Sequence, residues 1–411
     1  MPAHDFKDIG DVLNFQLLKG IITAIDSATD TCTVAVGGDT LAALLYYHCE
    51  PSSELRDNGA ISGAAKGFSE GDEVIVLINK EKTSIKVIGH TDGIRRCEEE
   101  GVPTIPGRGR NFFAGGISGS SLEDSDAIFM ILESDDTLSQ ISAVLSNPGN
   151  GKGGIRWDAA YFTGGSSDIL EYPLDVLLNI GTTPTISTSS GSLSRQRVNL
   201  ACLIDGSNGG YFAGGYGGLP QQNDIEFYGF LFGGQYLLSS TLATLGQGQV
   251  GVSASEKGYI AGGSISHDDP GWNETVDWIE SLFFADDTLS TLSSVLSIGR
   301  TFLASVQHSY TKGYFAGGGV EVEFGVFSIS KKIDAFLFAD ETIQTIVNLL
   351  EPLNFHAGAS GDTKGYFAGG EMGAYEESSI TNIISELNFE TESISVLSAV
   401  LPDSFTAMTG V

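Results

Sequence analysis

Thiol and imidazole groups that could bind zinc or form a disulfide are concentrated in the first hundred residues of the chain. They belong to Cys32, His48, Cys49, His90 and Cys97. Thiolate and imidazole are the usual ligands of structural zinc. However, no C-x-x-C pair is present, and strand neighbours such as His48 and Cys49 point to opposite faces of a sheet. We predict no metal site. Whether Cys32, Cys49 and Cys97 are free, or whether a disulfide such as Cys49–Cys97 forms, stays open.

Carboxylates offer a second chemistry, since the chain has 52 Asp and Glu against 21 Lys and Arg, a net charge of −31. Glycoside hydrolysis needs carboxylates that converge on one bond. Here the acidic residues recur instead in polar turns, "SDDT" at 134–137, "ADDT" at 285–288 and "ADET" at 339–342. We predict that the protein is not an enzyme and has no cofactor, with a carbohydrate-active enzyme as the less favoured alternative. A D-x-D-x-D-G calcium loop is absent from the sequence, and Ca²⁺ binding is left undecided.

Six Gly pairs, each preceded by a short aromatic segment, organise the chain from residue 110 onward. They read "NFFAGG", "AYFTGG", "GYFAGG", "GYIAGG", "GYFAGG" and "GYFAGG". The glycines are Gly115 and Gly116, Gly164 and Gly165, Gly214 and Gly215, Gly262 and Gly263, Gly317 and Gly318, and Gly369 and Gly370. The spacings between first glycines are 49, 50, 48, 55 and 52 residues, which indicates a repeat of one structural unit.

Each unit continues through a loop of variable length, an apolar segment, a polar turn and a second apolar segment. This pattern predicts four short antiparallel strands per unit, the signature of a propeller blade. A Gly pair permits positive φ and close backbone approach without a Cβ clash. We therefore assign the twelve glycines a structural role, and reject a phosphate-binding loop because neither a helix N-terminus nor a Lys follows the pairs.

This repeat resembles the kelch repeat, in which a Gly doublet closes the second strand of each blade. The resemblance covers residues 110–411 and implies a six-bladed β-propeller, although Leu and Phe replace the Tyr and Trp that usually follow the doublet. The C-terminal "SFTAMTGV" is similar to the strand before each pair, whereas "RGRNFFAGG" has no such strand before it. We expect the last strand to complete the first blade and close the ring. By repeat alignment Cys202 matches Ser305, which predicts a small core residue.

Residues 1–100 lack a Gly pair and carry five strand candidates. These are "LLKGIITAID", "DTCTVAVGG", "TLAALLYYHC", "GDEVIVLINK" and "TSIKVIGHTDG". The pattern predicts a small Greek-key barrel of the OB type, and "FSEGDEVIVLINKEKTSIKVIGHTDG" is similar to OB domains of phage baseplate and spike proteins. Residues 101–109 are then a linker into the propeller at 110–411. The barrel strands lack a basic, aromatic groove, so we predict a docking domain and not a nucleic-acid binder.

The loops that follow the Gly pairs should emerge on one face of the propeller. Their aromatic residues are Tyr216, Trp272, Phe324, Phe327 and Tyr375. Exposed aromatics on loops of a rigid scaffold are typical of surfaces that bind sugars or proteins. These five are the candidate binding residues, with the alternative that each only packs its own loop.

The strongly acidic composition argues against nucleic-acid and anionic-membrane partners. We also expect no membrane-spanning segment, and the start "MPAHDFKDIGDVLNF" does not predict a secretion signal. The expected function is a structural or adhesion protein of a phage tail or related injection particle, located in the virion tail as part of a multi-subunit assembly. Residues 1–100 would contact other particle proteins, and the propeller loops would contact a cell-surface glycan, a protein receptor or a neighbouring subunit. A generic kelch-like interaction module or extracellular appendage subunit is the alternative.

Overall fold

The computed structural model divides the chain into two compact units, Met1–Pro106 and Gly107–Val411. In the first unit it describes residues 15–26, 31–45, 70–71, 73–79 and 85–90. In the second it describes residues 109–411 except 157–158, 166–172, 179, 181–183, 207, 218–221, 231–233, 244–245, 267–272, 324–325 and 374–378. Of the expected linker at 101–109, only Gly109 lies within these residues. The regular elements described are all strands, so the fold is all-β, and no helix there could cross a membrane.

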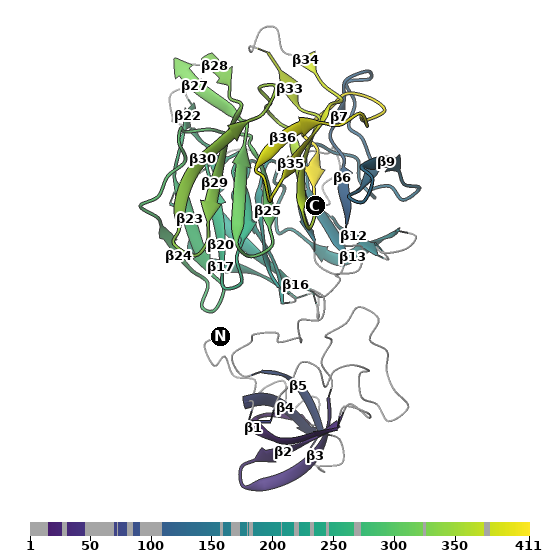
Figure 1. Ribbon diagram of the computed structural model, residues 1–411, viewed down its shortest axis with the longest axis vertical. Coiled ribbons are helices and arrows are strands. Elements are labelled where there is room, and N and C mark those ends of the chain that lie inside the picture. Colours follow the sequence, from purple (N-terminus) through teal and green to yellow (C-terminus); the bar gives the residue numbers. More distant parts are fainter. Residues whose placement is uncertain are drawn as a thin grey trace. The chain divides into compact units, whose positions relative to one another are not determined.

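The first unit is a closed five-stranded barrel, drawn in purple in Figure 1. Its strands are β1 (Phe15–Asp26), β2 (Thr31–Val36), β3 (Asp39–Leu45), β4 (Glu73–Asn79) and β5 (Ile85–His90). They are hydrogen-bonded in the order β1-β2-β3-β5-β4, β1 also pairs with β4, and only β3 and β5 run parallel. Alternate residues of β2 face inward, where Cys32 and Val34 pack with Val74, Val76 and Val87. All five strands lie where the sequence predicts strands.

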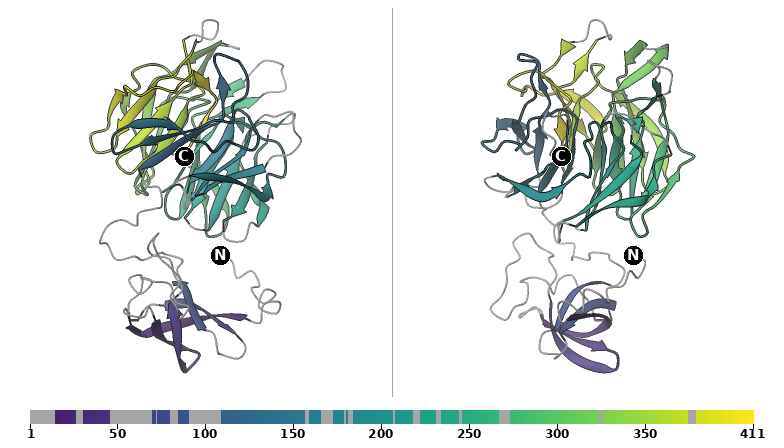
Figure 2. Two further views of the ribbon diagram at one scale, coloured as in Figure 1. Left: turned by 90° about the vertical axis from the view of Figure 1, so that its right-hand side faces the viewer. Right: turned by 180° about the vertical axis from the view of Figure 1, so that it is seen from behind.

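The second unit consists of six four-stranded antiparallel sheets, numbered 1 to 6 along the chain (Figures 1 and 2). Sheet 1 contains β38 (Thr409–Gly410), β6 (Arg110–Ala114), β8 (Ile128–Leu132) and β9 (Thr137–Gln140); sheet 2 contains β10 (Lys152–Arg156), β11 (Ala160–Gly164), β12 (Pro173–Leu178) and β13 (Thr185–Ser192). Sheet 3 contains β14 (Ala201–Asp205), β15 (Gly209–Ala213), β16 (Asp224–Gly229) and β17 (Gln235–Thr241); sheet 4 contains β19 (Val250–Ser253), β20 (Lys257–Ala261), β23 (Ile279–Phe283) and β24 (Thr288–Thr291). Sheet 5 contains β25 (Ala304–His308), β26 (Lys312–Ala316), β29 (Lys332–Leu337) and β30 (Thr342–Asn348); sheet 6 contains β31 (Ala357–Ser360), β32 (Lys364–Ala368), β35 (Ile384–Asn388) and β36 (Ser393–Val396).

Short strands form ribbons beyond the Gly pairs, and several of them are labelled at one end of the unit in Figure 1. They are β7 (Ile117–Ser118), β18 (Gly246–Gln247), β21 (Ser264–Ser266), β22 (Asn273–Thr275), β27 (Gly319–Glu323), β28 (Val326–Ile329), β33 (Glu371–Met372), β34 (Ser379–Ile380) and β37 (Phe405–Thr406). The loops that follow the pairs therefore start at the same end of their sheets. We call this end the loop face.

The hydrophobic core of this unit is distributed over six clusters, each shared by two neighbouring sheets. Between sheets 5 and 6, for example, Val306 and Tyr314 pack with Phe367 and Leu387. The cluster between sheets 6 and 1 closes the series, since Tyr366 packs there with Phe129. Burial of one large apolar side chain stabilises a fold by about 1.5–3 kcal/mol, so these interfaces are the main source of stability.

One residue just before the first strand of each sheet has a left-handed conformation, with φ between 52° and 72°. These six residues form the inner ring: Gly151, Asn199, Gly248, Phe302, Phe355 and Ala407. Each donates its backbone N–H to the carbonyl oxygen of the ring residue in the preceding sheet, with N–O distances of 2.7–3.2 Å. The circuit is closed because Gly151 donates to Ala407. The six sheets are thus connected without a break.

Each Gly pair lies at the end of the second strand of its sheet, across from the inner-ring residue that precedes the first strand. Their first glycines have φ of 64–73° and their second glycines 92–106°, a region that disfavours side chains. At Gly318 an added Cβ would also lie 2.8 Å from the carbonyl oxygen of Thr301. The chain therefore turns at the Gly pair, where the second strand ends, and the ribbons of the loop face begin after this turn.

The last strand of the chain completes the first sheet. Thr409 and Gly410 of β38 pair with Ala114 and Phe113 of β6, while β37 pairs with β7. In Figure 1 the C-terminus accordingly lies beside β6. Sheet 1 therefore contains both the first strand of the unit, β6, and the last, β38.

Candidate functional site

Of the five aromatic residues expected to form a binding surface, the structure describes Tyr216 in full. Its side chain is 38% exposed. Phe327 is described in its backbone, which pairs with Glu321 in the β27–β28 ribbon. Trp272, Phe324 and Tyr375 lie outside the described residues. Whether the five side chains gather therefore remains a prediction.

Tyr216 is held at the loop face by the backbone. It directly follows the pair Gly214–Gly215, and it exchanges two hydrogen bonds with Val198, with N–O distances of 2.7 and 2.9 Å. This pairing fixes the backbone position from which the aromatic ring of Tyr216 projects. Part of the loop that follows, residues 218–221, is outside the described residues.

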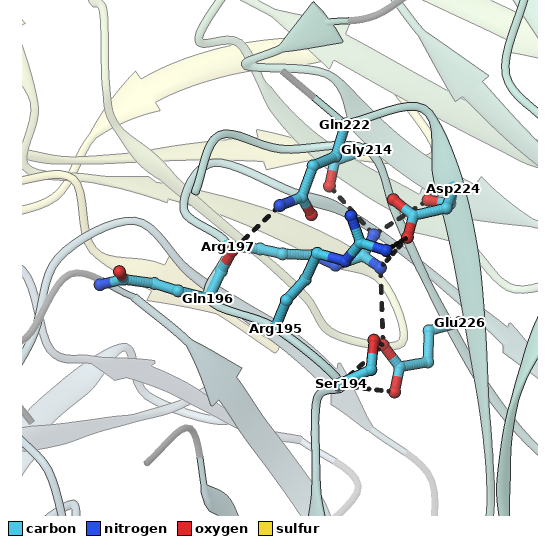
Figure 3. Close-up of polar contacts among 8 residues, drawn as sticks. All are labelled: Ser194, Arg195, Gln196, Arg197, Gly214, Gln222, Asp224 and Glu226. Atoms are coloured by element: carbon cyan, nitrogen blue, oxygen red, sulfur yellow. Dashed lines mark hydrogen bonds and ion pairs between the residues drawn. The ribbon is translucent and has the colours of Figure 1, made fainter. Parts of the chain in front are cut away.

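A cluster of charged side chains surrounds Arg197, the residue before Val198 (Figure 3). The fully buried Arg197 donates from Nη1 to the carbonyl oxygens of Gly214 (3.3 Å) and Asp224 (2.9 Å). Its Nη2 forms an ion pair with the Asp224 carboxylate at 2.9 Å. Arg195, which is half exposed, reaches the same carboxylate at 3.3 Å. Asp224 thus binds one buried and one exposed guanidinium.

The Glu226 carboxylate completes this cluster from below in Figure 3. It accepts hydrogen bonds from the backbone N–H (2.9 Å) and the hydroxyl (3.0 Å) of Ser194, and lies 3.5 Å from Arg197 Nη2. Burial lowers the pKa of Arg197, against the opposing effect of Asp224 and Glu226. The group remains a cation, since Arg is not deprotonated in proteins.

Sheet 5 has an equivalent arrangement built from other residues, and this repetition indicates the role of the Arg197 cluster. Arg300 donates to the carbonyl oxygens of Gly317 (2.9 Å) and Lys332 (2.7 Å), and pairs with Asp334 at 2.6 Å. Asp334 accepts from the backbone and hydroxyl of Ser297. Because both arginines bind the Gly-pair carbonyl and the third strand in the same way, we interpret Arg197 and Arg300 as structural. Among the described residues, only Arg195 and the Asp224 side chain of the sheet 3 cluster have no counterpart in the sheet 5 cluster.

The acidic residues of the polar turns connect neighbouring sheets. Glu392, at the turn of sheet 6, accepts from Lys312 Nζ (2.6 Å) and the Tyr314 hydroxyl (3.3 Å) of sheet 5. Burial and the Glu392 carboxylate raise the pKa of Tyr314. Tyr314 also stacks on Phe389 of sheet 6 at 5.4 Å. Equivalent contacts join Lys257 and Tyr259 to Glu341, Lys364 and Tyr366 to Asp136, and Tyr211 to Asp287. The acidic residues of the polar turns therefore join neighbouring sheets, which their place in turns does not reveal.

The inner ring carries a pair of aromatic residues that the sequence analysis missed. Phe302 and Phe355 stack with ring centroids 3.9 Å apart, and both are only partly buried. The left-handed conformation costs an ordinary residue about 1–2 kcal/mol, and Gly and Asn adopt it more readily. Gly or Asn occupies three of the other four ring positions. Bulky residues held in this conformation are a recognised indication of function. Alignment of "RTFLAS" with "LNFHAG" at the ring position could have pointed to the pair.

His356, next to Phe355, is a buried histidine at a position that sheets 1, 3 and 5 fill with an apolar residue. It is 4% exposed, and in the described structure neither ring nitrogen has a hydrogen-bond partner. The equivalent residues are Leu303 in sheet 5 and Met408 in sheet 1. Burial, with Arg300 nearby, lowers the pKa of His356 from 6.5 to about 3. The neutral imidazole is therefore the form that fits the fold.

Replacement of His356 by Leu should stabilise the protein by about 1–3 kcal/mol, because it removes buried polar atoms without partners. The pKa of His356 is lower in the folded than in the unfolded state, so the unfolded state takes up the proton first on acidification. The free energy of unfolding of the protein with His356 therefore does not depend on this group above about pH 6.5, and it decreases as the pH falls from there toward 3. The Leu variant lacks this decrease. Urea unfolding of both proteins at several pH values measures this difference. A variant that is less stable, or equally acid-sensitive, would contradict the assignment.

The two described thiols are not placed for chemistry. Burial raises the pKa of Cys32 to about 11 and that of Cys202 to about 12, so neither forms a thiolate readily. Cys202 pairs with Phe212 as Ser305 pairs with Phe315, in line with the repeat alignment. Within the described residues, His, Cys, Asp and Glu form no group able to hold a metal ion. His48, Cys49 and Cys97 lie outside them, and only the backbone of His90 is described.

Comparison with known proteins supports the fold and does not identify a function. No family model matches the chain, and no curated protein matches it. The structure is similar to that of YjhT, a kelch-like β-propeller protein, with a TM-score of 0.52 and 15% sequence identity over 64% of this chain and 87% of YjhT. The chain has a propeller-like fold. Because 320 chains of solved structures match and such folds host many activities, this likeness carries no functional assignment.

Proposed function

We propose that the protein is a non-enzymatic attachment protein of a phage tail or a related injection particle, whose loop face binds a host receptor or a neighbouring subunit. One observation carries the proposal: loops of variable length start at the same end of six sheets. The hydrogen bonds of the inner ring and the packing between neighbouring sheets hold these sheets rigid. Loops that vary on a fixed scaffold are the usual location of recognition. In this proposal Tyr216, Trp272, Phe324, Phe327 and Tyr375 contact the partner.

The finer fold assignment belongs to the same proposal. We infer that the six sheets are blades of a six-bladed, kelch-like propeller spanning 110–411, with residues 101–109 as its linker. The closed inner ring and the six inter-sheet clusters support six blades. The barrel order β1-β2-β3-β5-β4, with its parallel β3–β5 pair, supports an OB-like domain at 1–100.

The barrel is the proposed docking domain, with virion proteins as partners. Leu18 and Ile21 on β1 are 39% and 46% exposed. Exposed apolar side chains on a small domain favour contact with another protein over contact with a phosphate backbone. The net charge of −31 also disfavours nucleic acid and anionic membranes as partners. We place the protein in the virion tail as part of a multi-subunit assembly.

The absence of catalysis is also part of the proposal, and the roles of the described charged residues support it. Asp224, Glu226 and Asp334 bind buried arginines or backbone N–H groups. The turn carboxylates hold Lys and Tyr of neighbouring sheets. Groups used in this way are not free to converge on a substrate.

The attachment proposal predicts that Tyr216→Ala weakens binding without loss of stability. The labelled full-length protein would be tested on a panel of bacterial cells and an array of their surface polysaccharides. Tyr310→Ala is the matched control, because Tyr310 is 45% exposed on the β25–β26 turn, at the opposite end of its sheet. Equal binding by both variants, or turnover of a bound polysaccharide, would overturn the proposal.

A further inference from the structure

The outer edge of sheet 3 lacks the charged groups that border most of the other sheets. Its last strand, β17, reads "QYLLSST" and is hydrogen-bonded to β16 alone among the described strands. Residues 227–255, which include β17, contain no Asp, Glu, Lys, Arg or His. The segment before β17, "GFLFGG" at 229–234, has no carboxylate, whereas the equivalent segments of sheets 1, 4, 5 and 6 carry Asp or Glu. Charge or Pro usually protects a sheet edge from pairing with another chain, and β17 has neither.

The pairing of β16 with β17 shows which backbone groups of this edge point outward. Gly229 donates its N–H to the carbonyl oxygen of Gly234 at 2.8 Å. Hydrogen-bonded and non-bonded pairs alternate along an antiparallel ladder, so Tyr236 forms the next hydrogen-bonded pair with β16. The N–H and C=O groups of Gln235 and Leu237 therefore point away from β16. The irregularity of this ladder lies beyond Leu237, so these residues form a regular edge.

Two large apolar side chains are exposed on the same short stretch. Tyr236 is 49% exposed and Leu237 is 46% exposed. The Tyr236 ring is held in place, because its hydroxyl donates to Asp287 Oδ2 at 3.1 Å and its centroid lies 5.1 Å from that of Phe227. Exposed tyrosines that are already ordered are typical of the residues that dominate protein interfaces. Outward backbone groups and exposed apolar side chains thus coincide at Gln235–Leu237.

The charge of the protein favours a second copy of the chain as the occupant of this edge. Two copies, each of net charge −31, repel one another wherever their acidic surfaces meet. Like charges opposite each other also destabilise a pair of strands, and β17 has no charge to place there. A strand can pair antiparallel with its own copy about a two-fold axis. With the axis at Tyr236, Gln235 of one copy lies opposite Leu237 of the other, and the outward groups of both are hydrogen-bonded.

We propose that the β17 edge is a homodimer interface, in which β17 pairs antiparallel with β17 of a second copy. Sheet 3 of each copy then becomes half of one continuous sheet, with the two Tyr236 side chains directly opposite each other. This inference goes beyond the attachment function, because the loop face and Tyr216 take no part in it. Either proposal can therefore fail without the other. If Tyr236 only anchors Asp287, the edge stays open and the protein is a monomer.

Sedimentation velocity of the full-length protein, at concentrations from about 1 to 300 µM, tests the proposal. We expect a reversible monomer–dimer equilibrium. The dimer should become tighter as NaCl is added, because salt screens the repulsion between the acidic copies. A protein that stays monomeric throughout this range would overturn the proposal and leave an extended segment of another protein as the occupant. A dimer that dissociates when salt is added would also overturn it.

Leu237→Lys tests whether the dimer uses this edge. The variant should weaken dimerisation about 5- to 30-fold, since each dimer carries the new charge twice beside the axis. Tyr310→Lys is the matched control, because it makes the same change of charge at a side chain that is 45% exposed on the β25–β26 turn. It should not weaken the dimer, and neither should Tyr216→Ala. Equal weakening by the two Lys variants, or by neither, would contradict the assignment.

Leu237→Pro tests the pairing of the backbones. Proline removes the outward N–H but no hydrogen bond to β16, and edge strands tolerate it for this reason. The dimer should be lost while the melting temperature changes little. Leu237→Ala, which keeps the N–H, should retain measurable dimerisation. A folded Leu237→Pro variant that dimerises as well as Leu237→Ala would show that the strands do not pair, and if the Pro variant does not fold, the two Lys variants decide.

Discussion

A protein that lacks residues 404–411 should fail to form a stable second unit. The deletion removes β37 and β38, which pair with β7 and β6, and it opens the inner ring at Ala407. It also removes the buried side chains Phe405, Met408 and Val411. At about 1.5–3 kcal/mol for each side chain, the loss is comparable with the total stability of a typical domain, about 5–15 kcal/mol. Calorimetry should show the main transition lowered severely or absent.

A peptide provides the control for this deletion. Residues 404–411 supplied in excess should restore part of the transition, because the peptide can occupy the vacated edge of β6. A truncated chain that melts at the unchanged temperature would show that the pairing of β38 with β6 contributes little to the fold.

Replacement of Arg300 by Met should have the second largest effect. Arg300 and Asp334 are both fully buried, and the substitution leaves the carboxylate without its cation. Breaking a buried ion pair in this way costs about 3–5 kcal/mol. Denaturant unfolding should show this loss. The double variant Arg300→Met, Asp334→Leu should be less destabilised than Arg300→Met alone, because it leaves no buried charge.

Arg195→Met is the matched control for Arg300→Met. Arg195 also contacts a carboxylate, that of Asp224, but its side chain is 51% exposed. Exposed ion pairs contribute about 0–1 kcal/mol, so little change is expected. If Arg300→Met cost no more than Arg195→Met, the structural role assigned to the buried arginines would be wrong.

The candidate site was less accessible from the sequence than the fold. Aromatic residues in the loops after the Gly pairs predicted a binding surface, yet only Tyr216 is described in full. Phe302 and Phe355 were missed because their segments read as ordinary apolar strand residues. Their left-handed φ values, and the direction in which their rings lean, depend on contacts between sheets that are distant in the sequence.

The sequence by itself determined the period, the four-strand unit, the five barrel strands and the need for glycine at the paired positions. These features are encoded locally, by alternating apolar residues and by residues that tolerate unusual φ. Only the tertiary structure decided that Glu392 binds Lys312, that Arg300 is structural, and that Ala407 closes a ring with Gly151. Such contacts join residues dozens to hundreds of positions apart, which become neighbours only when the sheets form and pack on one another. The contact of Ala407 with Gly151 also needs the last strand to complete the first sheet.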